Sequence, residues 1–279
     1  MPQTLKNPHR GQGLPGAIRY PEADAAAVGR LLHQCPVHAP TPLVDAPALA
    51  RRCGAARLLI KDERARMGLG SFKALGAAHV IAREAAQAVR DGQWGQALAG
   101  RVFIAASAGN HGLSVAAGAR VFGATAIIYL AESVPEAFAD RLRATGAEVV
   151  RAGATYEDSM AAAEASAAAG AGVLLSDSSW PGYEDLPSQV MEGYLQLAAE
   201  AVEQIDAPPT HIFLQAGVGG LAAAVAAHAR AAWGDGPTIV VVEPDAAPAL
   251  IESIRAGAVV TTAGPVSAMG RLDCKTPSM

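Results

Sequence analysis

The chain has 279 residues, of which 51% are hydrophobic and 17% are charged, and its formal net charge is −4 at pH 7. Because domains commonly run to about 150 residues, this length predicts two lobes, with enough apolar residues for a large core. The mildly negative charge excludes the broad positive field that binds nucleic acids or anionic membranes, so we expect a small-molecule partner.

The termini and cysteines indicate where such a protein works. Residues 1–16 are polar and rich in proline and glycine, without the apolar core of a secretion signal. Alanine-rich stretches such as 160–169 are shorter than the ~20 residues that span a bilayer, so no membrane span is expected. Cys35, Cys53 and Cys274 form no CxxC pair, which favours reduced thiols in a cytoplasmic protein.

From about residue 101 onward, short β-branched runs alternate with alanine-rich runs, a pattern typical of a parallel sheet covered by helices. The fold class is therefore α/β. Glycines at 123, 146, 170 and 257 stand where helices would end in a left-handed cap. In chain order we predict a helix over 71–91, a strand over 101–106, a helix over 111–122, a strand over 124–130, a helix over 136–145, a strand over 148–151, a helix over 156–169, a strand over 172–175, a helix over 184–205, a strand over 211–215, a helix over 220–232, a strand over 238–243 and a helix over 247–256.

Three junctions place glycines or small residues just before a predicted helix, at 68–73, 107–112 and 215–221. Free N–H groups and the helix dipole at such a junction favour an anion. Gly217, Gly219 and Gly220 form the best phosphate-binding candidate, because they follow a predicted strand and open a helix. The segment lacks the Lys-Ser/Thr ending of a nucleotide P-loop and the full GxGxxG spacing, so the anion need not be a nucleotide.

Two side chains at these junctions have both a chemical and a plainer interpretation. Lys73 is in the first turn of an apolar helix, where a buried cation tends to lose its charge and become a nucleophile suited to Schiff-base chemistry. The alternative is a solvated surface lysine. Asn110 could hydrogen-bond a ring hydroxyl, or could simply occupy a left-handed turn after Gly109.

Taken together, these residues resemble the fold-type II pyridoxal-phosphate (PLP) enzymes, which include threonine and serine dehydratases, threonine synthase and diaminopropionate ammonia-lyase. The resemblance implies two lobes, each with a mostly parallel sheet flanked by helices, and PLP in the cleft between them. Residues 1–75 and 181–279 would form the larger cofactor domain, and 76–180 the smaller substrate-side domain. The segments that carry the resemblance are 41–43 (Thr-Pro-Leu), 59–63 (Leu-Ile-Lys-Asp-Glu), 68–76 (Gly-Leu-Gly-Ser-Phe-Lys-Ala-Leu-Gly), 107–112 (Ser-Ala-Gly-Asn-His-Gly), 217–221 (Gly-Val-Gly-Gly-Leu) and 242–244 (Val-Glu-Pro).

The resemblance also implies the roles of single residues. Lys73 would form the Schiff base with PLP, and Asn110 would contact the 3-hydroxyl of the cofactor. His111 is interpreted as a packing residue beside the substrate, because no second ligand stands at zinc spacing, and no metal site is predicted. The implied cofactor-binding residues are Phe72, Lys73, Asn110, Gly217, Val218, Gly219, Gly220 and Leu221, and the implied substrate-binding residues are Ser107, Ala108, Gly109 and His111.

Within the group, the residues at 177–180 (Asp-Ser-Ser-Trp), 182–184 (Gly-Tyr-Glu), Pro187 and 191–194 (Met-Glu-Gly-Tyr) look most like diaminopropionate ammonia-lyase. In that subfamily the aspartate that matches Asp177 is an acid/base residue near the substrate α-carbon. The alternative is that Asp177 only caps a turn before Trp180.

Two departures from that subfamily matter. Ala108 stands where the ammonia-lyase has a second aspartate, which is closer to the threonine-dehydratase pattern and puts proton abstraction from the D-configured face in question. Family members also continue well beyond the segment 267–278, where this sequence stops. The sequence would then be a piece of a longer protein, a naturally shorter protein, or a chain that a partner completes.

The implied reaction is PLP-dependent β-elimination, which converts 2,3-diaminopropionate to pyruvate and ammonia after Lys73 or Asp177 removes the α-proton. One alternative is a serine/threonine-type dehydratase or another β-replacing enzyme, which Ala108 favours. A second alternative is a catalytically impaired PLP-binding fragment or partner-binding remnant. The expected partners of the chain are a small amino acid and a second copy in a homodimer, with no nucleic acid or membrane.

Overall fold

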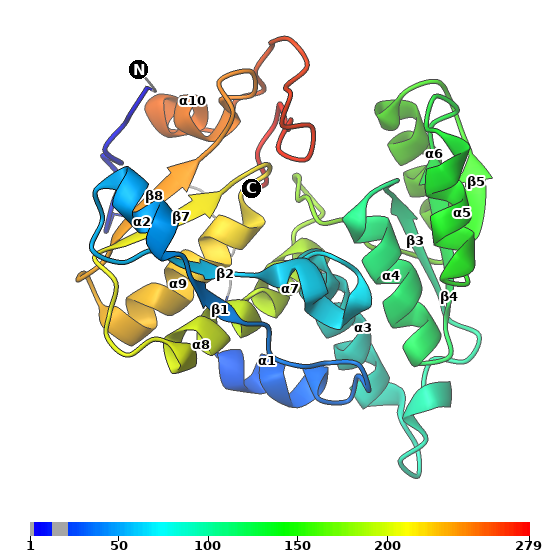
Figure 1. Ribbon diagram of the computed structural model, residues 1–279. Coiled ribbons are helices and arrows are strands. Elements are labelled where there is room, and N and C mark those ends of the chain that lie inside the picture. The colour runs from blue at the N-terminus through cyan, green and yellow to red at the C-terminus, as the bar shows by residue number, and fades with distance from the viewer. Residues whose placement is uncertain (1–2, 13–21) are drawn as a thin grey trace.

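The computed structural model describes residues 3–12 and 22–279, and its helices and strands gather into two lobes joined through α3 (Lys73–Ala88) and α7 (Asp185–Gly193) (Figure 1). No described helix is both long enough and apolar enough to cross a bilayer. The α/β prediction is confirmed, whereas the residue boundaries proposed for the two domains stay a prediction.

One lobe holds a four-stranded sheet in the order β5-β4-β3-β6, in which every pair is parallel. Phe103, Ile104 and Ile128 are fully buried in it, because helices cover both faces as a parallel sheet requires. The elements are β3 (Val102–Ala106), α4 (Asn110–Val121), β4 (Thr125–Leu130), α5 (Glu136–Ala144), β5 (Glu148–Arg151), α6 (Tyr156–Ala168) and β6 (Val173–Leu174), with the 3-10 turn η2 (Trp94–Gln96) before them.

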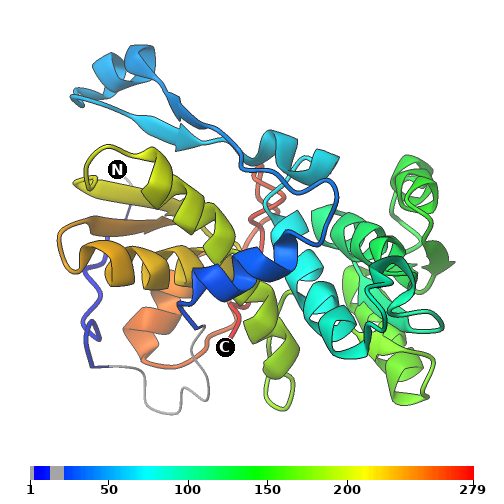
Figure 2. The same ribbon diagram turned by 90° about the horizontal axis from the view of Figure 1, so that it is seen from below.

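The other lobe has two small sheets. Strands β7 and β8 pair in parallel, and β1 and β2 form an antiparallel pair that, with α2, extends to one side of the lobe in Figure 2. Phe213 on β7 keeps 68% of its surface exposed, so this face of the sheet is not covered by the described chain. The elements are β1 (Leu43–Asp45), α2 (Pro47–Cys53), β2 (Leu59–Lys61), β7 (His211–Gln215), α9 (Gly220–Trp233), β8 (Thr238–Val242) and α10 (Ala249–Ala256).

The structure corrects several predicted boundaries. The single helix predicted over 184–205 is two helices, α7 and α8 (Leu195–Gln204), that meet at Tyr194. The helix predicted from 247 begins only at Ala249, because Pro248 occupies its N-cap. Strands β1 and β2 and the helices α1 (Ala25–Leu32), α2 and η1 (Glu63–Gly68) were not predicted.

Close packing of α7 on α3 explains why the long helix breaks. A Cβ at Gly193 would lie 2.6 Å from the Leu75 carbonyl oxygen and 2.8 Å from the Gly76 Cα atom. The backbones of the two helices therefore touch directly at these glycines, and α8 departs in a new direction to pack on α9 and α1.

We expect Gly76→Ala to destabilise the fold, because its Cβ would lie 2.7 Å from Val190 Cγ1 and 2.9 Å from the Val190 carbonyl oxygen. Overpacking of this kind costs about 1–3 kcal/mol, which urea unfolding would measure. Gly95→Ala is the matched control, since nothing lies within 4 Å of its added methyl group. Equal unfolding midpoints for both variants would contradict the close packing of α3 on α7.

Candidate active site

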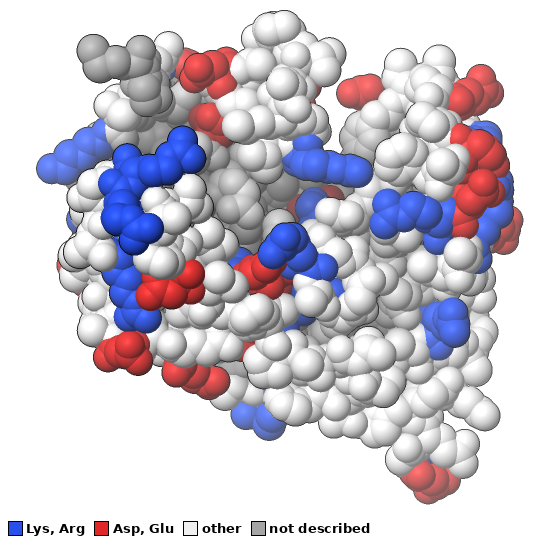
Figure 3. Space-filling view, in the orientation of Figure 1, with Lys and Arg blue, Asp and Glu red and all other residues white. Residues whose placement is uncertain are grey.

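The predicted substrate loop and Asp177 lie together because β3 and β6 are neighbouring parallel strands. Ile104 of β3 is in register with Leu174 of β6, so the carboxyl ends of these strands meet at one edge of the sheet. The loop 107–109 follows β3 and Asp177 follows β6 at that edge, which is where open α/β sheets bind ligands. On the same face of the molecule, Figure 3 shows the surface hollowed between the two lobes, with basic and acidic side chains meeting inside.

Lys73 reaches Asp177 across this cleft. Lys73 is the first residue of α3, and its amine forms an ion pair and hydrogen bond with the Asp177 carboxylate. The Lys73 side chain keeps 31% of its surface exposed and that of Asp177 keeps 17%. The amine thus lies against a carboxylate at a partly open site.

The electrostatic surroundings keep Asp177 ionised. Burial favours its neutral form, but the Lys73 ammonium and His111 outweigh that effect and hold the Asp177 pKa well below its usual value. The Asp177 carboxylate is therefore ionised while it faces the Lys73 ammonium. The same negative charge, added to burial, raises the pKa of Tyr183 to about 12, so that this phenol stays protonated.

His111 packs beneath the loop that follows β3 and links it to β6. His111 is buried, and its Nε2 atom lies 2.7 Å from the Leu175 carbonyl oxygen, to which it donates. This bond ties the start of α4 to the end of β6. The Ser107 hydroxyl accepts a hydrogen bond of 3.3 Å from the Gly109 amide, and Ala108 packs against the core.

The glycine-rich loop after β7 presents unused donors. Within the described chain, the amides of Gly217, Val218 and Gly219 make no hydrogen bond to protein, and neither does the Asn110 side chain. Gly219 has φ +102°, a conformation that side chains rarely adopt. Free amides at the start of α9 can bind a phosphate, and the Lys73 amine can bind an aldehyde, so these residues fit PLP.

Residues after 266 also contribute to the site, although none of them was among the predicted site residues. A Cβ at Gly217 would lie 2.9 Å from Cys274 Sγ, and one at Gly109 would lie 2.5 Å from Arg271 Nη1. The Ser278 amide donates to the Val218 carbonyl oxygen at 2.9 Å. Arg271 therefore brings a guanidinium to the substrate loop. Burial raises the pKa of the Cys274 thiol, which makes it a poor nucleophile.

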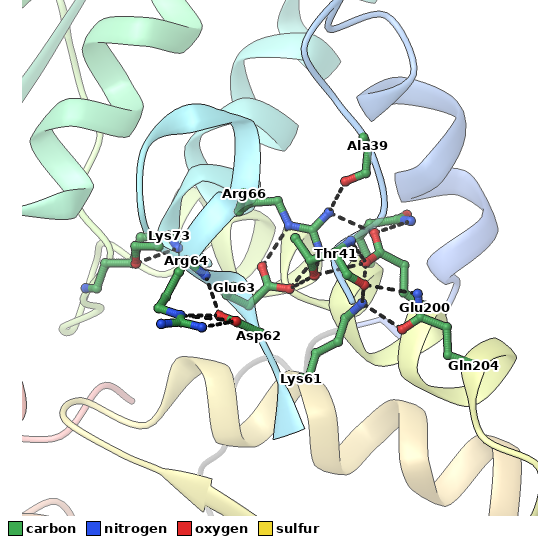
Figure 4. A network of polar contacts seen from close by, with 12 residues as sticks. Ala39, Thr41, Lys61, Asp62, Glu63, Arg64, Arg66, Lys73, Glu200 and Gln204 are labelled. Carbon is green, nitrogen blue, oxygen red and sulfur yellow. Dashed lines mark hydrogen bonds and ion pairs between the residues drawn. The ribbon is translucent and has the colours of Figure 1, made fainter. Parts of the chain in front are cut away.

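A buried network of charges supports the segment that leads to Lys73 (Figure 4). Arg66 is fully buried, and its guanidinium donates to Glu63 at 2.7 Å and to both carboxylate oxygens of Glu200 at 2.7 and 2.8 Å. Lys61 adds a second cation, 2.7 Å from Glu200. The positive φ of Met67 (49°) directly follows Arg66, so the network fixes the bend that turns the chain toward α3.

This network makes stability depend on pH. Burial alone would raise the pKa of Glu200, but hydrogen bonds from Arg66 and Lys61 have the larger effect and lower this pKa from 4.5 to about 2. A lowered pKa stabilises the fold above pH 4.5, and that stability is lost as the pH falls toward 2. The loss amounts to about 3 kcal/mol. Urea unfolding of wild type and Glu200→Gln at several pH values would measure it: the variant should lose less stability on acidification, and parallel curves would contradict the assignment.

The structure therefore brings most of the predicted site residues to one cleft. Lys73, Asp177 and Asn110 border it, together with the glycine loop and the loop at 107–109. Phe72 lies beside the cleft against Tyr194, with ring centroids 5.1 Å apart. Among the described residues, no group of three or more His, Cys, Asp or Glu side chains is placed to hold a metal ion.

Comparison with known proteins identifies the family of this arrangement. The family described as pyridoxal-phosphate dependent enzyme matches residues 35–279. The chain belongs to this family. Among family members, the diaminopropionate ammonia-lyase of Salmonella typhimurium is 35% identical over 235 residues, which cover 78% of this chain and 58% of that protein. The Escherichia coli diaminopropionate ammonia-lyase is 32% identical, over 91% of this chain and 67% of that protein.

Solved structures of pyridoxal-phosphate enzymes agree with this assignment. The crystal structure of the Escherichia coli ammonia-lyase in complex with D-serine matches with a TM-score of 0.82 at 31% identity, over 91% of this chain and 67% of that chain. The mouse L-serine dehydratase/L-threonine deaminase is a more distant relative at 30% identity, of which the chain covers 63%. The chain thus spans about 58–67% of these relatives, and the fold-type II prediction is confirmed.

Proposed function

We propose that this chain carries the site for PLP-dependent β-elimination, in which 2,3-diaminopropionate and water give pyruvate and two molecules of ammonia, one from the β-carbon and one released by hydrolysis. The observation that carries the proposal is the Lys73 amine paired with an ionised Asp177, opposite the unused amides of the Gly217 loop. The relatives named diaminopropionate ammonia-lyase support the choice of substrate.

Different residues around the cleft would bind different parts of the cofactor. The amides of Gly217, Val218 and Gly219 would hold the cofactor phosphate, and Asn110 its ring hydroxyl. Bound PLP supplies the electron sink that makes loss of the α-proton feasible. Lys73 would hold the cofactor until the substrate amine replaces it.

Two groups would then handle the substrate. The Asp177 carboxylate and the freed Lys73 amine lie next to each other. Either group could accept the α-proton, and the protonated partner could then donate a proton to the leaving β-amino group. The Arg271 guanidinium, beside Gly109, would hold the substrate carboxylate together with the Ser107 hydroxyl.

A spectrum and a product assay test the proposal. Purified protein with added PLP should show an absorbance band that borohydride fixes onto Lys73, and L- or D-2,3-diaminopropionate should shift this band and release pyruvate. Ala108 favours the second candidate, a serine/threonine-type dehydratase, which would instead release pyruvate from L-serine or 2-oxobutyrate from L-threonine. A band that responds to no amino acid would support the impaired PLP-binding remnant.

We expect Asp177→Asn to keep the cofactor and lose turnover. An amide has the shape of the carboxylate but cannot accept the α-proton, and loss of a general base costs about 10²–10⁴-fold in kcat. Asp206→Asn is the control, because Asp206 keeps 85% of its side chain exposed and lies outside the site. Full turnover by Asp177→Asn would remove this residue from the mechanism.

The resemblance further supports a homodimer in the cytoplasm. Light scattering of the purified protein tests the first part, since a molar mass near 28.3 kDa would mean a monomer.

A further inference from the structure

A second pocket is lined by residues of α1, α3 and α8 together with Glu22, Asp24 and Glu192, where α1 packs on α3 and α8. It has a volume of about 220 Å³ and shares no residue with the predicted site. That volume is below the ~300 Å³ at which drug-sized pockets begin, so it suits a smaller molecule.

The inner end of this pocket, which we call the α1 pocket, carries polar atoms without partners. His79 and Glu192 line it, and each is only 3% exposed. His79 Nε2 lies 3.7 Å from Glu192 Oε2, too far for a hydrogen bond. Neither ring nitrogen of His79 has a hydrogen-bond partner, and neither does Glu192 Oε1. Buried polar groups are nearly always satisfied, so these atoms indicate a ligand that donates hydrogen bonds.

The other walls complete the chemistry of the ligand. Arg83, which keeps 42% of its side chain exposed, stands 3.4 Å from the other oxygen of Glu192. Its guanidinium can also reach a carboxylate in the pocket. Val28, Leu31 and Leu195 form an aliphatic wall. The pocket thus offers an acceptor for an ammonium, a donor for a carboxylate and an apolar surface for a short side chain.

We infer that the α1 pocket binds a free α-amino acid with a small aliphatic side chain, its ammonium on Glu192 and His79 and its carboxylate on Arg83. Glu22 and Asp24 at the pocket mouth add negative charge that attracts the ammonium end.

The α1 pocket and the cleft share the helices α3 and α7. His79 and Arg83 are on α3, the helix that begins with Lys73. Glu192 follows Met191, whose Cγ atom would lie 3.0 Å from a Cβ at Gly220. A ligand held between α3 and α7 therefore contacts both helices that position the cleft, and its binding would change the cofactor affinity or the KM.

Calorimetry with L-2-aminobutyrate tests the inference, because this amino acid has no β leaving group and is not consumed. Wild-type holoenzyme should bind it saturably, and Glu192→Gln and Arg83→Gln should each weaken binding at least about tenfold. Propylamine and butyrate, which lack the carboxylate or the ammonium, should bind more weakly. Glu203→Gln, an exposed change on α8, is the control.

Binding in the cleft would give the opposite pattern. If Lys73→Ala abolishes binding of L-2-aminobutyrate while Glu192→Gln and Arg83→Gln leave it unchanged, the inference is overturned, as it is if no saturable binding occurs. Because Arg83 is half-exposed, Arg83→Gln should fold even where the buried Glu192→Gln does not. These outcomes do not depend on turnover, so they stand apart from the proposed elimination reaction.

Discussion

Lys73→Ala should abolish the cofactor absorbance band and lower turnover by at least about 10²-fold, the lower range for loss of a general acid or base. Lys73 is the lysine whose amine opens onto the cleft and meets the Asp177 carboxylate, so its loss removes both the covalent anchor and the proton partner. Absorbance with PLP, followed by borohydride reduction and peptide mapping, measures the first effect.

Lys275→Ala is the matched control for this variant. Lys275 also lies near the cleft, since its charge acts on Cys274, but its amine is held by the Ala246 and Pro265 carbonyl oxygens and by Asp273. We expect the control to keep the band. Reduced cofactor found on Lys275 or Lys61 would contradict the assignment of Lys73.

A second effect of Lys73→Ala follows from the same ion pair. Without the ammonium, burial dominates and the Asp177 pKa rises. The variant should therefore lose stability at neutral pH and regain part of it as the pH falls and Asp177 takes up a proton. This recovery separates loss of the ion pair from general damage to the fold.

Local sequence signals were enough for the lobe with the four-stranded sheet. The strand at Glu148–Arg151 has the predicted bounds, and α5 ends at Ala144, two residues before Gly146, which has φ +95°. Such elements are bounded by glycine caps and short apolar runs, features that lie within a few residues of each other.

Elements that depend on distant contacts were missed. The segment from Glu63 to Gly68 bends because Arg66 pairs with Glu200, and no spacing in the sequence relates these two residues. The break between α7 and α8 likewise depends on Gly193 meeting Gly76 of another helix. Tertiary contact decides the backbone at both places, and a pattern read along one segment does not contain it.

The candidate site divides in the same way. Lys73, Asn110 and the Gly217 loop each stand at a loop-to-helix junction, but their predicted roles came from the combined resemblance to the fold-type II enzymes and not from any one local pattern. The pairing of Lys73 with Asp177 across the cleft was not predicted, nor was the approach of Arg271 to Gly109. Those contacts bring together segments that the sheet order, and not the sequence spacing, makes neighbours.

The charge network behind the cleft gives the largest expected effect on stability. Arg66→Met should destabilise the protein by about 3–5 kcal/mol, because removal of the buried guanidinium leaves two carboxylates, Glu63 and Glu200, with Lys61 as the one remaining cation of the network. Lys61 would still contact Glu200, but the hydrogen bonds to Glu63 and Thr41 from Arg66 would be lost. Urea unfolding with and without PLP would measure the change, and the affinity for PLP should fall with it, since the bend at Met67 is no longer fixed.

Two further variants make this prediction specific. Arg64→Met, two residues away on a side chain that is 88% exposed, should leave the unfolding midpoint unchanged. Adding Glu200→Met to Arg66→Met should restore part of the lost stability, because the buried carboxylate that lost its Arg66 partner is then gone. A double variant as unstable as the sum of the two single variants would mean that the charges act independently, and that Arg66 supports the Lys73 segment by packing alone.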